Sequence, residues 1–96
     1  MSRFLLSREA ESDLDSISNR VANDDPAAAT RLLDEFESRC VALATTPGAG
    51  WAREELGSGL RSSHLGKYVI FYVEDADGVV IVRILHGHRD LPRLFD

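Results

Sequence analysis

The chain has little of several features that would mark a specialised class of protein. Its 96 residues include one cysteine, one tryptophan and three prolines. A lone cysteine, Cys40, allows no intrachain disulfide and no zinc-ligand spacing. No stretch approaches the roughly 20 apolar residues of a membrane span, and the apolar run at the N-terminus is too short for a signal peptide. The simplest expectation is a cytoplasmic protein with no membrane partner.

An excess of positive charge is also missing. The formal net charge is −5, from 11 basic and 16 acidic side chains, and both halves of the sequence are acidic. Proteins that bind nucleic acid unaided normally present a basic surface. We therefore expect no direct nucleic-acid binding outside a complex with a target or a partner protein, although a local basic patch can oppose the net charge.

The N-terminal half predicts a short strand and a first helix. The chain is long enough for one domain, spanning residues 1–96, and too short for two. Residues 3–6 form a strand candidate, and Ser7 fits the N-cap of a helix. Apolar residues then recur at spacings of 4, 3 and 4, at Ala10, Leu14, Ile17 and Val21. The polar residues between them, Asp13 included, are expected on the solvent-exposed face of this helix.

A second helix is predicted after a short break. Asp25 is placed to cap it, and Pro26 occupies the first helical position, where its missing N–H costs nothing. Its apolar stripe consists of Ala29, Leu33, Phe36, Cys40 and Leu43. Residues 45–48 end the helix, so the two helices form an antiparallel hairpin. In this stripe Cys40 is interpreted as a small buried hydrophobic residue; a reactive thiol is the alternative.

The C-terminal half changes to a period of two and predicts three strands. They cover residues 60–64, 67–73 and 79–86, with a hairpin loop at 74–78. The run Val69–Val73 is apolar throughout and predicts a central strand covered on both faces. Strict alternation in the last strand places Val80, Val82, Ile84 and His86 on one face and Val79, Ile81, Arg83 and Leu85 on the other. The predicted fold class is α+β: an N-terminal strand, a helical hairpin and a three-stranded antiparallel meander in one sheet packed on the hairpin.

The segment 47–58 reads as an irregular connection around the single tryptophan, Trp51. A tryptophan in a glycine-rich loop more often anchors the loop to the core. The alternative is an exposed hot spot for a partner protein.

Polar residues gather at the end of the last predicted strand: Arg83, His86, His88, Arg89 and Asp90 fall within eight residues. The two histidines have three interpretations. They could act as general acid and base beside arginines that stabilise a phosphate. They could bind a metal, although no nearby carboxylate or cysteine spacing completes a site. The third interpretation, which we favour, is structural pairing and solvation, with no cofactor and no metal.

Two arginines on the predicted strands also have alternative roles. Arg83 is either a paired arginine that fixes the end of the strand or a surface cation for a partner's carboxylate or phosphate. Arg61 is slightly favoured as a structural partner of Glu54, Glu55 or Asp90. If their strands are antiparallel neighbours, Arg61 and Arg83 could share one face of the sheet.

The order of these segments resembles the RelE/ParE family of small bacterial toxins. The residues from Ser7 to Leu14 are similar to a Ser-x-x-Ala-x-x-Asp-Leu pattern at the first helix of family members, and residues 47–50 are similar to the family's turn after the second helix. Residues 57–62, 68–72 and 83–90 are similar to segments typical of ParE-like toxins. The resemblance implies the same fold, with the N-terminal strand joining the sheet.

Function within this family divides into two branches. RelE-like members cut messenger RNA in the ribosome with a cluster of Lys, Arg and an aromatic or acidic base. ParE-like members lack the complete cluster and poison DNA gyrase. Here only Arg61 and Arg83 fall near the places of that cluster, which favours the ParE branch.

The resemblance therefore implies a non-enzymatic gyrase poison, neutralised by a ParD-like antitoxin in a hetero-oligomer. The candidate contacts with target or antitoxin are Arg61, Arg83, His86, His88, Arg89 and Trp51. The alternative is a ribosome-dependent endoribonuclease that uses Arg61, Arg83, His86 and His88. An inactive family member is a third possibility.

Overall fold

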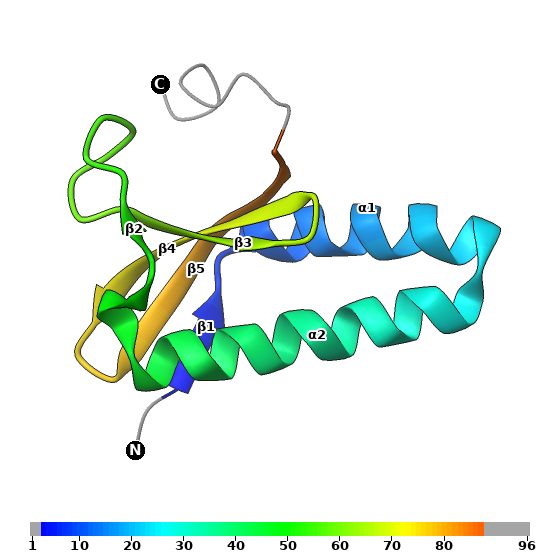
Figure 1. Ribbon diagram of the computed structural model, residues 1–96, viewed down its shortest axis with the longest axis horizontal. Coiled ribbons are helices and arrows are strands. Elements are labelled where there is room, and N and C mark those ends of the chain that lie inside the picture. The colour runs from blue at the N-terminus through cyan, green and yellow to red at the C-terminus, as the bar shows by residue number, and fades with distance from the viewer. Residues whose placement is uncertain (1–2, 88–96) are drawn as a thin grey trace.

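The computed structural model describes residues 3–87 and contains two helices and a five-stranded sheet. Figure 1 shows the two long helices as an antiparallel hairpin beside the sheet. The elements follow in the order β1 (Arg3–Leu6), α1 (Arg8–Asp24), α2 (Pro26–Thr45), a 3-10 turn (Pro47–Ala49), β2 (Trp51–Ala52), β3 (Arg61–Leu65), β4 (Tyr68–Asp75) and β5 (Gly78–His86). Neither of the described helices is apolar enough, over a sufficient length, to cross a membrane.

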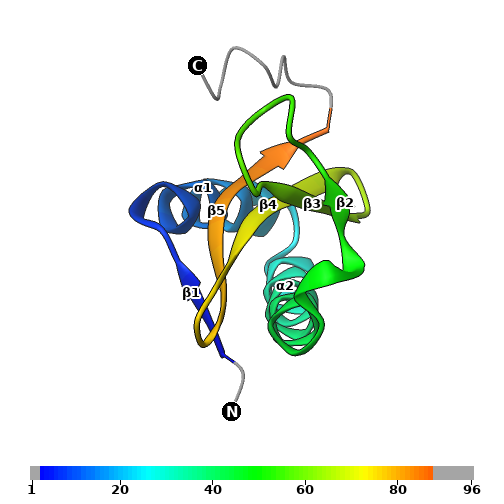
Figure 2. The same cartoon turned by 90° about the vertical axis from the view of Figure 1, so that its left-hand side faces the viewer.

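The strands lie in the order β1-β5-β4-β3-β2. β3, β4 and β5 form the antiparallel meander, and β1 joins it in parallel with β5, from Arg3 beside Gly78 to Leu6 beside Ile81. β1 and β2 therefore lie at opposite edges of the sheet, as Figure 2 shows. The predicted α+β class, the helical hairpin and the joining of the N-terminal strand to the meander are confirmed.

Both helices begin where the sequence predicts. The Ser7 hydroxyl accepts a hydrogen bond from the backbone N–H of Ala10, at 3.0 Å. The Asp25 carboxylate accepts from the N–H groups of Ala27 and Ala28, with Pro26 at the first helical position. These side chains satisfy donors that have no partner inside a helix. The sequence therefore determines the start of each helix locally.

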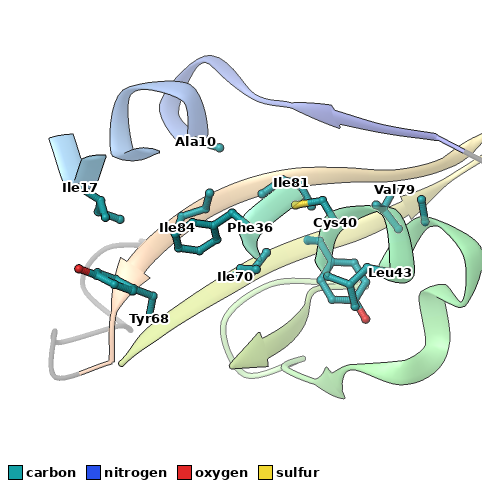
Figure 3. Close-up of a cluster of buried hydrophobic side chains, with 12 residues drawn as sticks. Ala10, Ile17, Phe36, Cys40, Leu43, Tyr68, Ile70, Val79, Ile81 and Ile84 are labelled. Carbon is teal, nitrogen blue, oxygen red and sulfur yellow. The ribbon is translucent and has the colours of Figure 1, made fainter. Parts of the chain in front are cut away.

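The main core lies between the hairpin and one face of the sheet. Its centre is formed by Phe36 and Cys40 of α2 against Ile70, Ile81 and Ile84 of the strands (Figure 3). A second cluster covers the other face of the sheet, where Leu56 and Leu60 of the loop before β3 pack on strand residues that include Val69, Phe71 and Leu85. β4 is thus covered on both faces, as predicted.

The predicted alternation of β5 is wrong at one point. Ile81 pairs with Tyr72 and Arg83 pairs with Phe71, so Val82 is an extra residue on β5, a β-bulge. Beyond the bulge the strand's faces exchange. Val79, Ile81 and Ile84 consequently share the hairpin side, while Val82 and Leu85 pack on the other side.

Several smaller expectations also need correction. The segment predicted as an irregular connection contains the short strand β2, and the hairpin loop is shorter than predicted because β4 continues to Asp75 and β5 begins at Gly78. Trp51 does not anchor its loop, because 75% of its surface is exposed. The loop is instead held by Tyr72, whose hydroxyl donates to the Pro47 carbonyl and accepts from the Gly50 N–H.

Candidate functional site

Arg83, the central residue of the predicted polar cluster, is bound to the first helix. Its Nε and Nη2 donate to the two carboxylate oxygens of Asp13, at 2.8 and 2.9 Å, a bidentate ion pair. Hydrogen bonding to Asp13 raises the pKa of the Arg83 guanidinium, and this effect outweighs the opposing effect of burial. Of the two interpretations of Arg83, the paired arginine at the strand end is the one that the structure shows.

Asp13 also contacts the sheet directly. The prediction that it lies on the solvent-exposed face of the helix is therefore wrong. Its carboxylate accepts a third hydrogen bond, from the backbone N–H of Ile84, at 3.0 Å. β1 pairs with β5 only as far as Ile81, so beyond that point none of the described strands lies beside this edge of β5.

Ser7 hydrogen-bonds the part of the β5 edge that lies between the end of β1 and the contact with Asp13. Its backbone N–H donates to the carbonyl of Ile81, at 2.9 Å, and its hydroxyl donates to the carbonyl of Val82, at 2.7 Å. Ala10, between the two on the helix, is fully buried. The Ser-x-x-Ala-x-x-Asp pattern therefore has a structural explanation: the two polar side chains hydrogen-bond the exposed edge of β5, and the small residue allows close approach.

Arg61, the second predicted arginine, is occupied elsewhere. Its Nη1 donates to the carbonyl of Gly50, at 2.9 Å, rather than to Glu54 or Glu55. The third carboxylate proposed from the sequence, Asp90, lies outside the described residues. Arg61 lies opposite Tyr72 and Arg83 opposite Phe71. Because consecutive residues of β4 face opposite sides of the sheet, the two arginines do not share a face.

Of the two predicted histidines, only His86 lies within the described residues. It ends β5 and pairs with Tyr68 of β4, with the two ring centroids 5.9 Å apart in an edge-to-face arrangement. His88 and Arg89, with Asp90, lie outside the described part of the chain. Three site residues of the ribonuclease alternative therefore lie within residues 3–87. Arg61 hydrogen-bonds a backbone carbonyl, Arg83 forms an ion pair with Asp13, and the His86 ring packs against the Tyr68 ring.

Sequence reasoning missed two further arginines that hold the sheet. Arg39 of α2 donates to the Ser63 hydroxyl and to the His64 carbonyl on β3. The Arg53 guanidinium lies 5.7 Å from the centre of the Phe71 ring and pairs with Glu55 at 2.8 Å. The only sequence signal for Arg39 is its position beside the buried Cys40, and that position does not specify a partner.

An apolar groove opens between the two helices above β1. It has a volume of about 200 Å³. Its lining is formed by Phe4, Leu6, Leu14, Leu33, Phe36, Cys40 and Ile84, with Glu37 as the charged residue among the described lining. Leu33 contributes because 38% of its surface is exposed, although the helical stripe predicted it as core. We refer to this feature as the hairpin groove.

Cys40 lies at the base of the hairpin groove with 2% of its surface exposed, which confirms the buried interpretation. Burial raises the pKa of its thiol to about 11, an effect that the neighbouring Arg39 opposes and Glu37 reinforces. At pH 8 only about one thiol in a thousand is then ionised. We expect a disulfide reagent such as Ellman's to react at least tenfold more slowly with the native chain than with the urea-unfolded chain. Equal rates would contradict this assignment.

Comparison with known proteins places the chain in a family. The family model described as the ParE toxin of the type II toxin–antitoxin system parDE matches residues 4–91. Toxin ParE3 of Caulobacter vibrioides is 32% identical over 92 residues, which are 95% of this chain and 92% of that protein.

Two solved structures share the fold. The chromosomal ParDE toxin–antitoxin system from P. aeruginosa matches with a TM-score of 0.73 at 21% identity, over 90% of this chain and 96% of that one. The RelBE2 toxin–antitoxin complex from Mycobacterium tuberculosis matches with a TM-score of 0.62 at 26% identity, over 88% and 96%. With a family model that covers nearly its whole length, the chain belongs to the ParE toxin family of type II toxin–antitoxin systems.

Proposed function

We propose that this toxin inhibits DNA gyrase in the cytoplasm, without a cofactor, and that direct binding of a ParD-like antitoxin neutralises it. The observation that carries the proposal is the ion pair between Arg83 and Asp13. Cleavage of RNA by acid–base chemistry needs cations aimed at the phosphate on which charge develops. In this chain both family-position arginines have protein acceptors instead, and they point to different faces of the sheet. A protein-binding surface, rather than a reaction centre, accounts for this arrangement.

The hairpin groove supports the antitoxin part of the proposal. It is apolar, and the helices that border it are acidic: residues 8–45 hold nine acidic and four basic side chains. An amphipathic segment with apolar residues on one side and cations on the other is complementary to such a surface. The two solved structures that share the fold, from ParDE and RelBE2 toxin–antitoxin systems, are consistent with a partner of this kind.

A supercoiling assay with the purified chain and purified gyrase tests the proposal. We expect supercoiling to fall as toxin is added and cleaved DNA to accumulate, because a poison traps the enzyme on its substrate. An equimolar amount of the ParD-like antitoxin proposed as the partner should restore supercoiling. The Asp15→Ala variant serves as a folded control, because Asp15 is exposed and its side chain makes no hydrogen bond or ion pair within residues 3–87.

A companion assay distinguishes the alternative activity. The same preparation is added to a translating extract, and its messenger RNA is mapped for cuts. Unimpaired supercoiling together with codon-linked cuts would replace the proposal with ribosome-dependent RNA cleavage. Unimpaired supercoiling with intact RNA would leave a family member that has lost its toxicity.

A further inference from the structure

A second cavity lies where β5 ends, between α1 and the sheet. It has a volume of about 170 Å³ and is lined from three elements. α1 contributes Asp13, Ser16 and Arg20, β4 contributes Tyr68, and β5 contributes Ile84 and His86. Figure 3 shows Ile17, which also lines the cavity, and Tyr68 at one end of the core cluster, with the Tyr68 hydroxyl directed away from the other labelled side chains. We refer to this feature as the α1–β5 cavity.

The α1–β5 cavity offers several hydrogen-bond donors, and the negative charge in its described lining is already paired. The carboxylate of Asp13, the only acidic side chain in the described lining, accepts two hydrogen bonds from Arg83 and one from Ile84. Ser16 and Tyr68 can each donate through a hydroxyl. Arg20 makes no hydrogen bond or ion pair within residues 3–87, so all five of its donors remain available there.

The charge around the cavity is opposite in sign to that of the whole chain. Asp13 and Arg83 neutralise one another, so Arg20 leaves the cavity with a net positive charge in a chain of net charge −5. A second cation lies close by, because Lys67 Nζ is 5.8 Å from the centre of the Tyr68 ring. Beyond Tyr68 an adjoining cavity is lined by Lys67 and Arg31, with Glu35 opposing them.

We propose that the α1–β5 cavity binds a small oxyanion of the phosphate type. A guanidinium with free N–H groups binds phosphate oxygens with two parallel hydrogen bonds, and the Ser16 and Tyr68 hydroxyls supply further donors. The volume is well below the roughly 300–1,000 Å³ of pockets that enclose a drug-sized molecule, so the cavity accommodates the anion itself or the phosphate end of a larger ligand. Of the described lining residues this site shares only Ile84 with the hairpin groove, and its existence does not depend on the gyrase proposal.

Titration of the full chain with inorganic phosphate, followed by ¹H–¹⁵N NMR at constant ionic strength set with chloride, tests the proposal. We expect saturable shifts confined to residues 16–20, 68 and 84–86 and to the side-chain Nε–H of Arg20, with a dissociation constant in the millimolar range. Arg20→Gln should weaken binding about tenfold, because one charge-assisted pair is lost. The variant should fold, since Arg20 is exposed and its side chain has no partner within residues 3–87.

A matched control separates a built site from general charge attraction. Arg8→Gln removes the same charge from an exposed position of the same helix that does not line the cavity, and it should change the affinity less than twofold. A second arm replaces phosphate with a nucleoside monophosphate: shifts at the same residues identify the phosphate group as the part that is bound. Shifts that do not saturate, or that weaken equally in both arginine variants, would overturn the proposal.

Discussion

Replacement of Asp13 by alanine is expected to lower the free energy of unfolding by about 3 kcal/mol, the lower end of the range for breaking a buried ion pair. The corresponding fall in melting temperature is roughly 12–24 °C for a domain of this size. The side chains of Asp13 and Arg83 are only 14% and 23% exposed, so solvent replaces the lost partner poorly. The alanine variant leaves both a guanidinium and the Ile84 N–H without their acceptor. Urea unfolding followed by circular dichroism measures the loss.

Two further variants show which part of this loss belongs to the ion pair. Asp13→Asn keeps a carbonyl that can accept from Ile84 but removes the charge, so its loss should be smaller. In the double variant Asp13→Ala, Arg83→Met, the unpaired cation is gone while the aliphatic stem of residue 83 is kept, and part of the stability should return. Asp15→Ala, on the exposed side of the same helix, should change stability by less than about 0.5 kcal/mol. A loss at Asp13 no larger than that at Asp15 would show that the contact with β5 contributes nothing.

The contact between Asp13 and β5 also shows what the sequence could and could not predict. The helix starts follow from local rules: Ser7 and Asp25 cap by hydrogen-bonding N–H groups two or three residues ahead, and such contacts can be inferred from spacing alone. The partner of Asp13 is 70 residues away, on a strand whose edge is open only because β1 is short. Helical periodicity predicted that the Asp13 side chain lies on the solvent-exposed face of the first helix. Only the resemblance to the Ser-x-x-Ala-x-x-Asp-Leu pattern marked the position, and it gave no reason.

The β-bulge at Val82 limited the prediction in a different way. Alternation assumes one residue per step, so a single extra residue reverses every later assignment on the strand. Nothing in the run Val79–Leu85 distinguishes Val82 from its neighbours, since all but Arg83 are aliphatic. The same bulge determines the candidate site, because it sets the register in which Arg83 lies opposite Phe71 and Ile84 faces the helices. The register of β5 on β4 is therefore determined by the packing of the two faces of the sheet, and not by a local sequence signal.

Phe36→Ala is expected to cost about 3–5 kcal/mol of unfolding free energy, because it removes a large, almost fully buried side chain from the main core. Phe36 is 1% exposed, and its ring centroid lies 5.8 Å from that of Tyr68. Leu33→Ala, from the same predicted stripe of α2, should cost only about 1 kcal/mol, since burial energy scales with the area removed from water and Leu33 is 38% exposed.

The two positions also separate stability from binding. Leu33 lines the hairpin groove and should remain folded as alanine, so a loss of antitoxin affinity in Leu33→Ala with little change in urea midpoint assigns the groove to the partner. Phe36→Ala is expected to lose toxicity and antitoxin binding together, because less of the chain is folded at 37 °C. Equal destabilisation of the two variants would mean that the groove is closed in solution. Leu33 would then belong to the core, as its spacing with Phe36 and Cys40 suggested.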